Sequence, residues 1–428
     1  MLSSRERLTL ALNHQQPDRV PVDLGGSVVT GMHVSSVYRL RQALELDAPG
    51  TPVKVIEPYQ MLGEIKSDLL DALGADVVSL ASPKTMFGFR NQGWKPWSLF
   101  DGTPVLVPEG FNTEPEPSGD VLMYPEGDRS APPSGRMPKG GFYFDAVIRQ
   151  PPLDEASLDP QDNLEEFGPI GDEELEHFRH EAERLATESD RAVLANFGGT
   201  SFGDIALVPA PWLKHPRGIR DVEEWYVSLA RRQDYIYQIF ERQCEIALPN
   251  LERLHAAVGD RVTAVMVTGT DFGMQSGPML SPQTYRSLFK PFHKRVNDWI
   301  HQHTSWKTFI HSCGSVMALL TDFIEAGFDI LNPVQCSAAD MDPHLLKERF
   351  GDEVVFWGGG VSTQHTLPFG TPEEVHDEVC RRVRVFAPGG GFVFNTVHNV
   401  QPQVPAENLL ALYGALRDCG RYPVGDVS

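Results

Sequence analysis

Lys307-Thr-Phe-Ile-His-Ser-Cys-Gly314 is the stretch that decides the fold, because an apolar run ends there in polar side chains and a glycine. A short apolar run bounded by a loop is typical of a buried parallel strand. Similar short runs occur at 19–24, 76–80, 192–196, 261–267, 329–331, 354–357 and 392–396. Longer helical patterns separate most of them. Together with 307–311 they make eight strands, which predicts an α/β fold, a (β/α)8 TIM barrel.

The helices are expected in the intervals between the strands. They are predicted at 36–45, 61–73, 173–188, 222–257, 282–303, 316–326, 343–350, 373–386 and 405–419. Three of them have clear start signals, since Ser281, Asp342 and Thr371 each precede a proline. Such a side chain can cap the first turn while proline occupies the first helical position.

Residues 86–152 interrupt the alternation of predicted strands and helices, because they are rich in glycine, proline and aromatic residues. Stretches such as GTPVLVPEGF and GGFYFDAVIRQ are typical of antiparallel strands. We expect an inserted β-hairpin region that folds over one rim of the barrel, within a single domain that spans residues 1–428.

Composition excludes several classes of function. A formal net charge of −21 argues against binding to nucleic acid or to an anionic membrane surface. No apolar run is long enough to span a bilayer and no secretion signal is visible, so we expect a cytoplasmic protein. The five cysteines do not form a disulfide pattern, and we expect reduced thiols.

A candidate metal site lies at the end of the strand 307–311. Residues two apart on a strand face the same side, so His311 and Cys313 should project together where the strand opens into its loop. Zinc is commonly bound by such a nitrogen and sulfur pair, and a catalytic zinc site keeps one position open. The alternative is a reduced cysteine beside a hydrogen-bonded histidine.

Other strand ends carry further candidates. Asp271 lies in a glycine-rich loop, where it could act as a general acid or base or simply cap a turn. His398 follows the last strand, as a catalytic group or a surface histidine. Cys336 is a possible further thiolate ligand or a structural thiol.

These segments together resemble the uroporphyrinogen decarboxylase superfamily over nearly the whole chain. Six motifs carry the resemblance: R-x-x-x-A-L-x-x-x-x-P-D-R-V-P-V at 7–22, L-G-A-D-V-V at 73–78, D-F-G-x-Q-x-G at 271–277, H-S-C-G at 311–314, N-P-V-Q at 332–335 and P-x-E-N at 405–408. The resemblance implies a (β/α)8 barrel with its site at the carboxyl ends of the strands. It also implies substrate-binding roles for polar residues in or beside these motifs, namely Gln275, Asn332, Gln335 and Asn395.

The superfamily contains cofactor-free decarboxylases and corrinoid-linked methyltransferases such as the methylcobamide:coenzyme M enzymes. The decarboxylases have an arginine-rich amino-terminal motif and an aspartate after the second strand, whereas this chain has Val22-Asp-Leu-Gly-Gly-Ser27 and Val78-Ser-Leu-Ala-Ser-Pro83 at these places. The methyltransferases match at His311 and Cys313, their first two zinc ligands. Their third ligand is a cysteine, at a place where this chain has His398, as the decarboxylases do.

The resemblance therefore favours a zinc-dependent methyltransferase that moves a methyl group between a corrinoid and a small thiol or similar acceptor. His311, Cys313 and His398 would hold the zinc, Asp271 and His398 would be catalytic, and a partner protein would carry the corrinoid as co-substrate. A homodimer is compatible with this hypothesis. The alternatives are a decarboxylase that acts on a porphyrinogen or related substrate, and a non-catalytic corrinoid- or tetrapyrrole-binding protein. Polar residues at the strand ends argue against a passive pocket.

Overall fold

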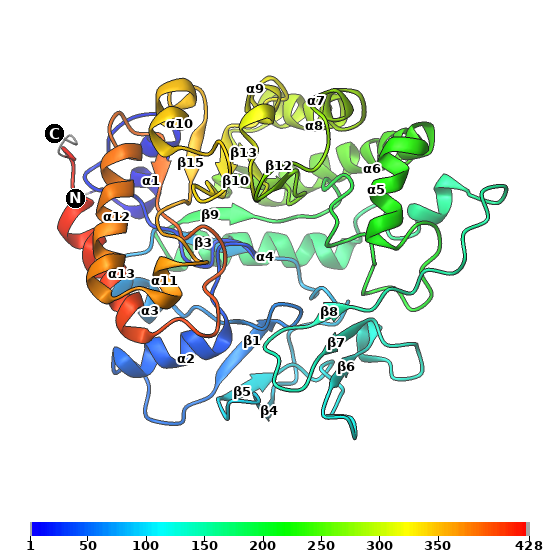
Figure 1. Cartoon of the computed structure of the whole chain (residues 1–428), viewed down its shortest axis with the longest axis horizontal. Helices are drawn as coiled ribbons and strands as arrows, with labels where there is room; N and C mark the ends of the chain where they lie inside the picture. The colour runs from blue at the N-terminus through cyan, green and yellow to red at the C-terminus, as the bar shows by residue number, and fades with distance from the viewer. Residues whose placement is uncertain (1, 425–428) are drawn as a thin grey trace.

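The main sheet of the computed structural model, which describes residues 2–424, consists of seven parallel strands. Their order is β16-β15-β14-β13-β10-β9-β3 (Figure 1). The strands are β3 (Val77–Leu80), β9 (Ala192–Ala195), β10 (Ala264–Thr268), β13 (Lys307–His311), β14 (Ile330–Asn332), β15 (Val355–Trp357) and β16 (Phe392–Val393). Each lies within or overlaps a stretch expected from the sequence, and the sheet curls as in a TIM barrel.

The eighth expected strand, 19–24, is an extended segment with an isolated parallel bridge between Val22 and Phe394. The amide of Phe394 donates to the carbonyl of Pro21 at 2.8 Å, and the amide of Asp76 donates to the carbonyl of Val22 at 2.7 Å. The segment therefore bridges the two edge strands of the sheet, β16 and β3. Pro21 has no N–H to donate, which helps to explain why no regular ladder forms here.

Helices surround the sheet (Figure 1). They are α1 (Ser4–Leu12), α2 (Val34–Ala43), α3 (Ser67–Leu73), α4 (Asp172–Glu188), α5 (Val222–Arg231), α6 (Gln233–Val258), α7 (Pro282–Thr284), α8 (Lys290–His303), α9 (Leu320–Glu325), α10 (Pro343–Phe350), α11 (Thr366–Phe369), α12 (Pro372–Phe386) and α13 (Ala406–Cys419). The three capping predictions are confirmed. Ser281, Asp342 and Thr371 each accept a hydrogen bond from a backbone amide of the first turn.

Three expected helices differ from the structure. The stretch 222–257 is divided at Arg232 into α5 and α6, and 282–303 contains a π-helical turn at Tyr285–Phe289. The helix expected at 61–73 begins only at Ser67, because Leu62–Gly63 forms the short strand β2. A Cβ at Gly63 would lie 3.0 Å from the Cα of Val34, so glycine allows this close contact with α2.

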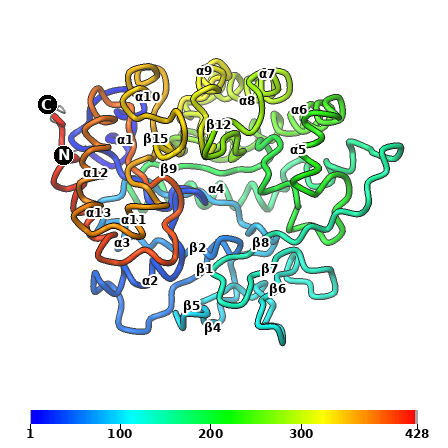
Figure 2. The backbone as a smooth tube through the Cα atoms, in the orientation of Figure 1, coloured from blue at the N-terminus to red at the C-terminus, as the bar shows by residue number. Residues whose placement is uncertain are grey.

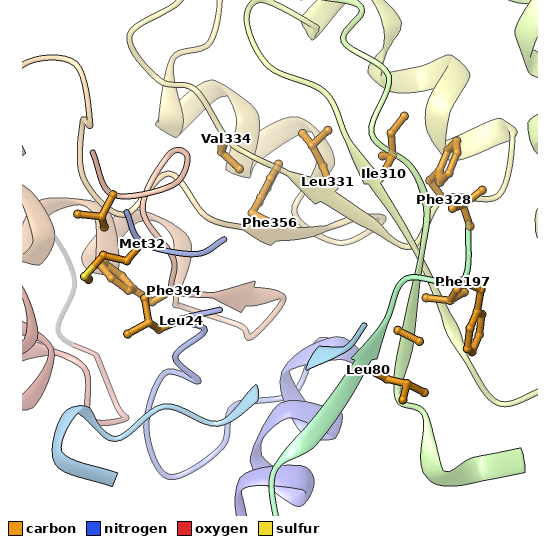
Figure 3. Packing of buried hydrophobic residues seen from close by; sticks show 14 of the residues in the cluster. Leu24, Met32, Leu80, Phe197, Ile310, Phe328, Leu331, Val334, Phe356 and Phe394 are labelled. Carbon is orange, nitrogen blue, oxygen red and sulfur yellow. The ribbon is translucent and has the colours of Figure 1, made fainter. Parts of the chain in front are cut away.

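Alternate residues of the barrel strands pack into two different clusters. Phe309 and Ile330 belong to the cluster inside the barrel, whereas Ile310, Leu331 and Phe356 belong to the larger cluster that includes residues of the helices (Figure 3). Because side chains alternate along a strand, His311 follows Phe309 on the inner face, and Asn332 follows Ile330. Both polar side chains therefore lie at the carboxyl end of the barrel interior.

Strands β4 (Lys95–Ser98), β5 (Pro104–Val107), β6 (Val121–Met123), β7 (Gly135–Met137) and β8 (Asp145–Ala146) lie within residues 86–152. Strands β6, β7 and β8 form an antiparallel sheet, and Figure 2 shows the region on one side of the barrel. The other sheet, in the order β2-β1-β5-β4, also takes in β1 (Val53–Glu57) and β2 (Leu62–Gly63). The β region, as we call these two sheets, therefore extends beyond the expected range 86–152, because it also includes β1 and β2.

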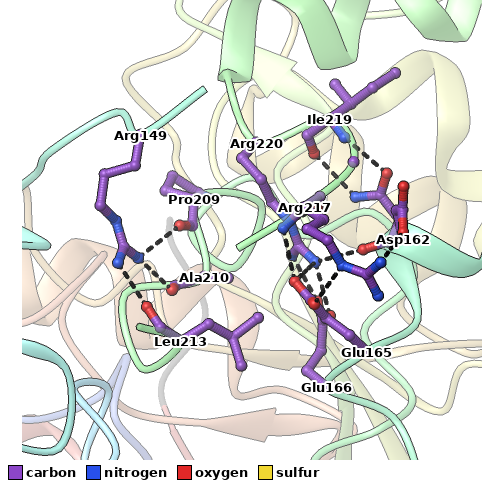
Figure 4. Close-up of polar contacts among 12 residues, drawn as sticks. Arg149, Asp162, Glu165, Glu166, Pro209, Ala210, Leu213, Arg217, Ile219 and Arg220 are labelled. Carbon is purple, nitrogen blue, oxygen red and sulfur yellow. Dashed lines mark hydrogen bonds and ion pairs between the residues drawn. The ribbon is translucent and has the colours of Figure 1, made fainter. Parts of the chain in front are cut away.

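Residues 196–221 form a long irregular connection between β9 and α5. The half-buried Arg149 and the buried Arg220 anchor it (Figure 4). The guanidinium of Arg149 donates to the carbonyls of Ala210 at 2.7 Å and Leu213 at 2.5 Å. That of Arg220 forms an ion pair with Glu166 at 2.8 Å. Burial and the neighbouring Arg220 lower the pKa of Arg149 to about 10. The connection is thus held against the rim of the barrel.

The expectation that all five cysteines are reduced is wrong for two of them, because Cys380 and Cys419 form a disulfide between α12 and α13. Their Cα atoms lie 5.7 Å apart although 39 positions separate them in the sequence. Sequence spacing alone does not indicate such pairing. In the part of the chain that the structure describes, no helix has the length and apolarity needed to cross a membrane.

Candidate functional site

His311, Cys313 and His398 come together at the carboxyl ends of β13 and β16. One potential ligand atom from each residue lies within 4.8 Å of the other two. The Sγ of Cys313 is 3.5 Å from the Nε2 of His311, and the two imidazole rings are 5.3 Å apart between centroids. The residues expected to form the metal site are therefore neighbours, although His398 lies 87 positions after His311 in the sequence.

Asn332 orients the His311 ring. The Nδ1 of His311 lies 2.6 Å from the side-chain oxygen of Asn332, whose amide nitrogen donates to the carbonyl of Trp357 at 2.8 Å. Because an amide oxygen only accepts, Nδ1 of His311 carries the proton and its Nε2 lone pair faces the thiol of Cys313. Burial lowers the pKa of His311 to about 4, so the ring is neutral at pH 7.

His398 is held differently. Its Nδ1 accepts a hydrogen bond from the backbone amide of Asn399 at 2.8 Å, so its neutral ring carries the proton on Nε2. The Asn399 side chain is in turn fixed, since its oxygen accepts from the amide of Gly31 at 2.6 Å. Burial and the nearby His311 lower the pKa of His398 to about 4. A metal at this ring would have to displace the amide hydrogen bond or the Nε2 proton.

Asp271 binds the loop that carries Cys313. Its Oδ1 accepts a hydrogen bond from the backbone amide of Cys313 at 2.7 Å. Burial and the negative charge of Asp271 raise the pKa of the Cys313 thiol well above its usual value, and burial raises the pKa of Asp271. In the absence of a cation the thiol therefore keeps its proton, and a bound cation would favour the thiolate.

Two glycines allow these loops to approach so closely. A Cβ at Gly273 would lie 2.6 Å from the carbonyl oxygen of Cys313, and a Cβ at Gly314 would lie 2.4 Å from the carbonyl carbon of Gly273. Gly314 also has φ +82°, a conformation that residues with side chains rarely adopt. The glycines of D-F-G and H-S-C-G therefore place Asp271 beside Cys313.

Asp204 and Tyr226 were not expected from the sequence, yet both lie within electrostatic reach of Asp271. Burial and the charge of Asp271 raise the pKa of Asp204 to about 7. Burial and the two carboxylates raise the pKa of Tyr226 to about 12. Asp204 lies in the irregular connection between β9 and α5, where no strand periodicity marks a functional residue. The only sequence signal is its position after Gly203 in a stretch that follows a strand.

The four expected substrate-binding residues differ in their surroundings. Asn332, Gln335 and Asn395 are buried, and the Gln335 side chain accepts from the amide of Gly314 at 2.8 Å. Asn395 donates to the carbonyl of Asp23 at 3.0 Å, whereas its side-chain oxygen has no hydrogen-bond partner among the described residues. Gln275 is exposed on the loop after β10. Asn332 and Gln335 thus hold the site in shape.

The donor set fits zinc. One thiolate and two imidazoles are ligands that zinc prefers, and three protein ligands leave a fourth position for a substrate. Asn332 supplies the hydrogen bond that commonly fixes a metal-binding histidine. Cys336 is not part of this cluster. Its Sγ lies 3.5 Å from the carbonyl of Val334, and burial raises its pKa to about 11. The fit is weakest at His398, where Nδ1 already accepts a hydrogen bond.

A curled parallel sheet surrounded by helices, with polar groups gathered at the strand ends, defines a (β/α)8-barrel architecture of the kind that carries enzyme active sites. Residues 219–419 match the family model described as "Uroporphyrinogen decarboxylase (URO-D)". Over this part of the chain the match agrees with the superfamily that the sequence motifs indicated.

Curated relatives give the same superfamily at low identity. The uroporphyrinogen decarboxylase of Pelobacter propionicus is 25% identical over 224 residues, which cover 51% of this chain and 58% of the relative. That of Pseudoalteromonas translucida is 26% identical over 176 residues, which cover 39% of this chain and 47% of the relative. The matches therefore span about half the length of these relatives.

Among solved structures, a methyltransferase from Methanosarcina mazei is similar over 98% of this chain and 99% of its own, with a TM-score of 0.54 and 16% identity. At this identity the likeness shows the fold alone. The likeness in fold includes the residues before 219, which lie outside the family match.

Proposed function

We propose that this protein is a zinc-dependent methyltransferase that moves a methyl group between a corrinoid and a small thiol or similar acceptor. The observation that carries the proposal is the cluster of His311, Cys313 and His398, with Asn332 directing the Nε2 of His311 toward the thiol. A purely structural cysteine would not need an oriented imidazole lone pair beside it. The fold of the M. mazei methyltransferase is consistent with this function.

Several residues of the chain would have distinct roles in this reaction. His311, Cys313 and His398 would hold the zinc, which when bound lowers the pKa of an acceptor thiol and so keeps it as a nucleophile at neutral pH. Asp271 fixes the backbone of the Cys313 loop through its 2.7 Å hydrogen bond. Asp204, whose pKa is about 7, can hold a proton at its carboxyl group and release it near neutral pH.

Decarboxylation of a porphyrinogen or a related carboxylated substrate is the second candidate. It is favoured by the His398 ring, because the hydrogen bond from the Asn399 amide to Nδ1 leaves a proton on Nε2. That N–H could donate to a substrate carboxylate. The names of the curated relatives agree with this candidate, whereas the lack of an arginine between Val22 and Ser27 argues against it.

The methyltransferase proposal implies particular partners. The corrinoid would be a co-substrate carried by a separate protein, because cobalt performs the methyl exchange and the chain supplies positioning. We further propose that the protein acts in the cytoplasm and assembles as a homodimer.

The two candidate activities can be measured side by side under anaerobic conditions. Methylcobalamin with coenzyme M tests methyl transfer through the change in corrinoid absorbance, and uroporphyrinogen tests decarboxylation through chromatography of the products. We expect corrinoid demethylation by the wild type and by Cys336→Ser, and none by Cys313→Ser. Porphyrinogen turnover by the wild type that survives in Cys313→Ser would support the decarboxylase instead.

A further inference from the structure

A pocket of about 370 Å³ lies beside the last barrel loop, next to the β region. Its lining comes from four separate parts of the chain: His33, Tyr59, Gln60, Leu62, Tyr143, Phe144, Asp145, Asn399, Val400 and Gln401. The volume suits a small organic molecule. Because Asn399 directly follows His398 and donates to its ring at 2.8 Å, the pocket adjoins the candidate zinc site.

The pocket wall is held firmly. The Nε2 of His33 lies 2.9 Å from the carbonyl of Phe142, and the amide of Phe144 donates to the carbonyl of Tyr59 at 3.0 Å. The side-chain amide of Asn399 donates to the side-chain oxygen of Gln60 at 2.8 Å. These contacts join the strand β8, the segment around β2 and the loop after β16. The pocket is therefore a formed feature of the fold.

The charges of the residues that line the pocket favour a positively charged ligand. Asp145 is the only acidic side chain among the described residues that line the pocket, and no lysine or arginine is among them. Burial lowers the pKa of the remaining candidate cation, His33, to about 4. Asp145 forms no ion pair with another described residue. Its cross-strand neighbour Arg136 contacts Asp120 instead, at 2.6 Å. A carboxylate without a protein counter-ion is thus available to a ligand.

Aromatic side chains complete the pocket. Tyr143 lines the pocket and is 45% exposed, so its side chain is accessible to a ligand. Tyr59 is half-buried, and Asp145 lies close enough to raise the pKa of its phenol together with burial. Phe144 also lines the pocket and is buried. Aromatic rings beside a carboxylate form the environment that attracts methylated ammonium groups.

We propose that this pocket binds a methylated ammonium group of a small organic cation. An anionic ligand would meet the Asp145 carboxylate without any cationic lining group to offset the repulsion. The claim that the bound cation takes part in methyl transfer rests on the proposed function, whereas the claim that it binds does not. As a substrate such a cation would be the methyl donor: its C–N bond would break, the methyl group would pass to the corrinoid, and the amine would leave with one methyl group fewer.

Binding of choline to the full-length protein tests the proposal, with 3,3-dimethylbutan-1-ol as the uncharged molecule of the same shape. Titration calorimetry should show choline binding at least about tenfold more tightly than the alcohol, as a cation–π contact together with an ion pair provides. Asp145→Asn should remove most of this preference. Glu114→Gln, which changes an exposed carboxylate away from the pocket by the same charge, should preserve it.

Tyr143→Leu provides a second variant, since it removes the exposed ring and keeps the charge. It should weaken choline binding several-fold. The proposal is overturned if choline does not bind, if choline and the alcohol bind equally, or if Asp145→Asn and Glu114→Gln have the same effect. None of these measurements requires zinc or methyl transfer. Failure of the pocket and failure of the proposed function are therefore distinguishable.

Discussion

Residues 219–419 and residues 2–218 contribute different things to the mouth of the barrel. The first region contains His311, Cys313 and His398, and it coincides with the family match. The second region contributes Asp204 and most of the pocket lined by His33, Tyr59 and Tyr143. In the first region the polar residues lie at or shortly after strand ends. In the second they lie mainly in connections and in the β region.

This difference suggests a division of roles: the strand ends of residues 219–419 provide the proposed metal site, and residues 2–218 provide most of the pocket that would select the ligand. A strand end fixes the backbone, so that His311 is held by a strand and by Asn332 on the neighbouring strand. A connection between strands can change its side chains without disturbing the barrel. If this division is correct, variants in the first region should change zinc affinity, and those in the second should alter ligand binding or the pH dependence of stability.

Cys313→Ser should have the largest effect. Loss of the only sulfur in the cluster should lower zinc affinity by more than about 100-fold, because removal of a supporting residue alone typically costs 10- to 100-fold. The melting temperature should stay close to that of the wild type, since residues at the carboxyl mouth of a barrel contribute little to its core. Zinc content measured by inductively coupled plasma mass spectrometry checks this. Cys336→Ser is the matched control, and equal zinc loss in both would refute the assignment.

Asn332→Leu should have the next largest effect. Without the amide oxygen the Nδ1 proton of His311 loses its acceptor, and zinc affinity should fall by about 10- to 100-fold. Asn332→Asp retains an acceptor and should recover most of the affinity. Competition with a chromogenic chelator measures both variants. Equal weakening by leucine and aspartate would show that Asn332 acts through packing rather than by orienting His311.

Much of the barrel could be predicted because its strands are short apolar runs, and because residues two apart on a strand share a face. The same reasoning placed His311 beside Cys313. It could not place Asp204, which lies in a connection without periodicity, nor the disulfide between Cys380 and Cys419, which depends on how two helices pack. The strand β2 was missed for a related reason, since a two-residue strand is specified by its neighbours and not by its own sequence.

His398→Cys should have a smaller effect on zinc than the two preceding changes. The variant replaces an imidazole whose Nδ1 already accepts a hydrogen bond with a thiolate ligand, so zinc binding should be retained or tightened by up to about tenfold. Absorption spectroscopy at the zinc edge should show one additional sulfur. If the variant binds no zinc while Cys313 and His311 are intact, His398 does not occupy a ligand position.

Asp204→Asn should change stability in a pH-dependent manner. The pKa of Asp204 is about 7 in the folded chain against an ordinary 3.8, so the folded state holds a proton that the unfolded state releases. The stability from this proton is present below about pH 4 and is lost as the pH rises to about 7. The variant should therefore exceed the wild type by roughly 1–2 kcal/mol in free energy of unfolding at pH 8, after discounting for partial exposure.

Urea unfolding at pH 4 and pH 8 measures this difference. The gap between the variant and the wild type should narrow toward pH 4, where both side chains are uncharged. A constant gap at all pH values would show that Asp204 is not protonated in the folded state at neutral pH.

The metal content of the wild-type protein, purified without a histidine tag, tests the central claim most directly. We expect near-stoichiometric zinc that a chelator removes together with corrinoid demethylation, and zinc that restores this activity when it is added back. A folded protein that contains no zinc and still decarboxylates a porphyrinogen would contradict the account.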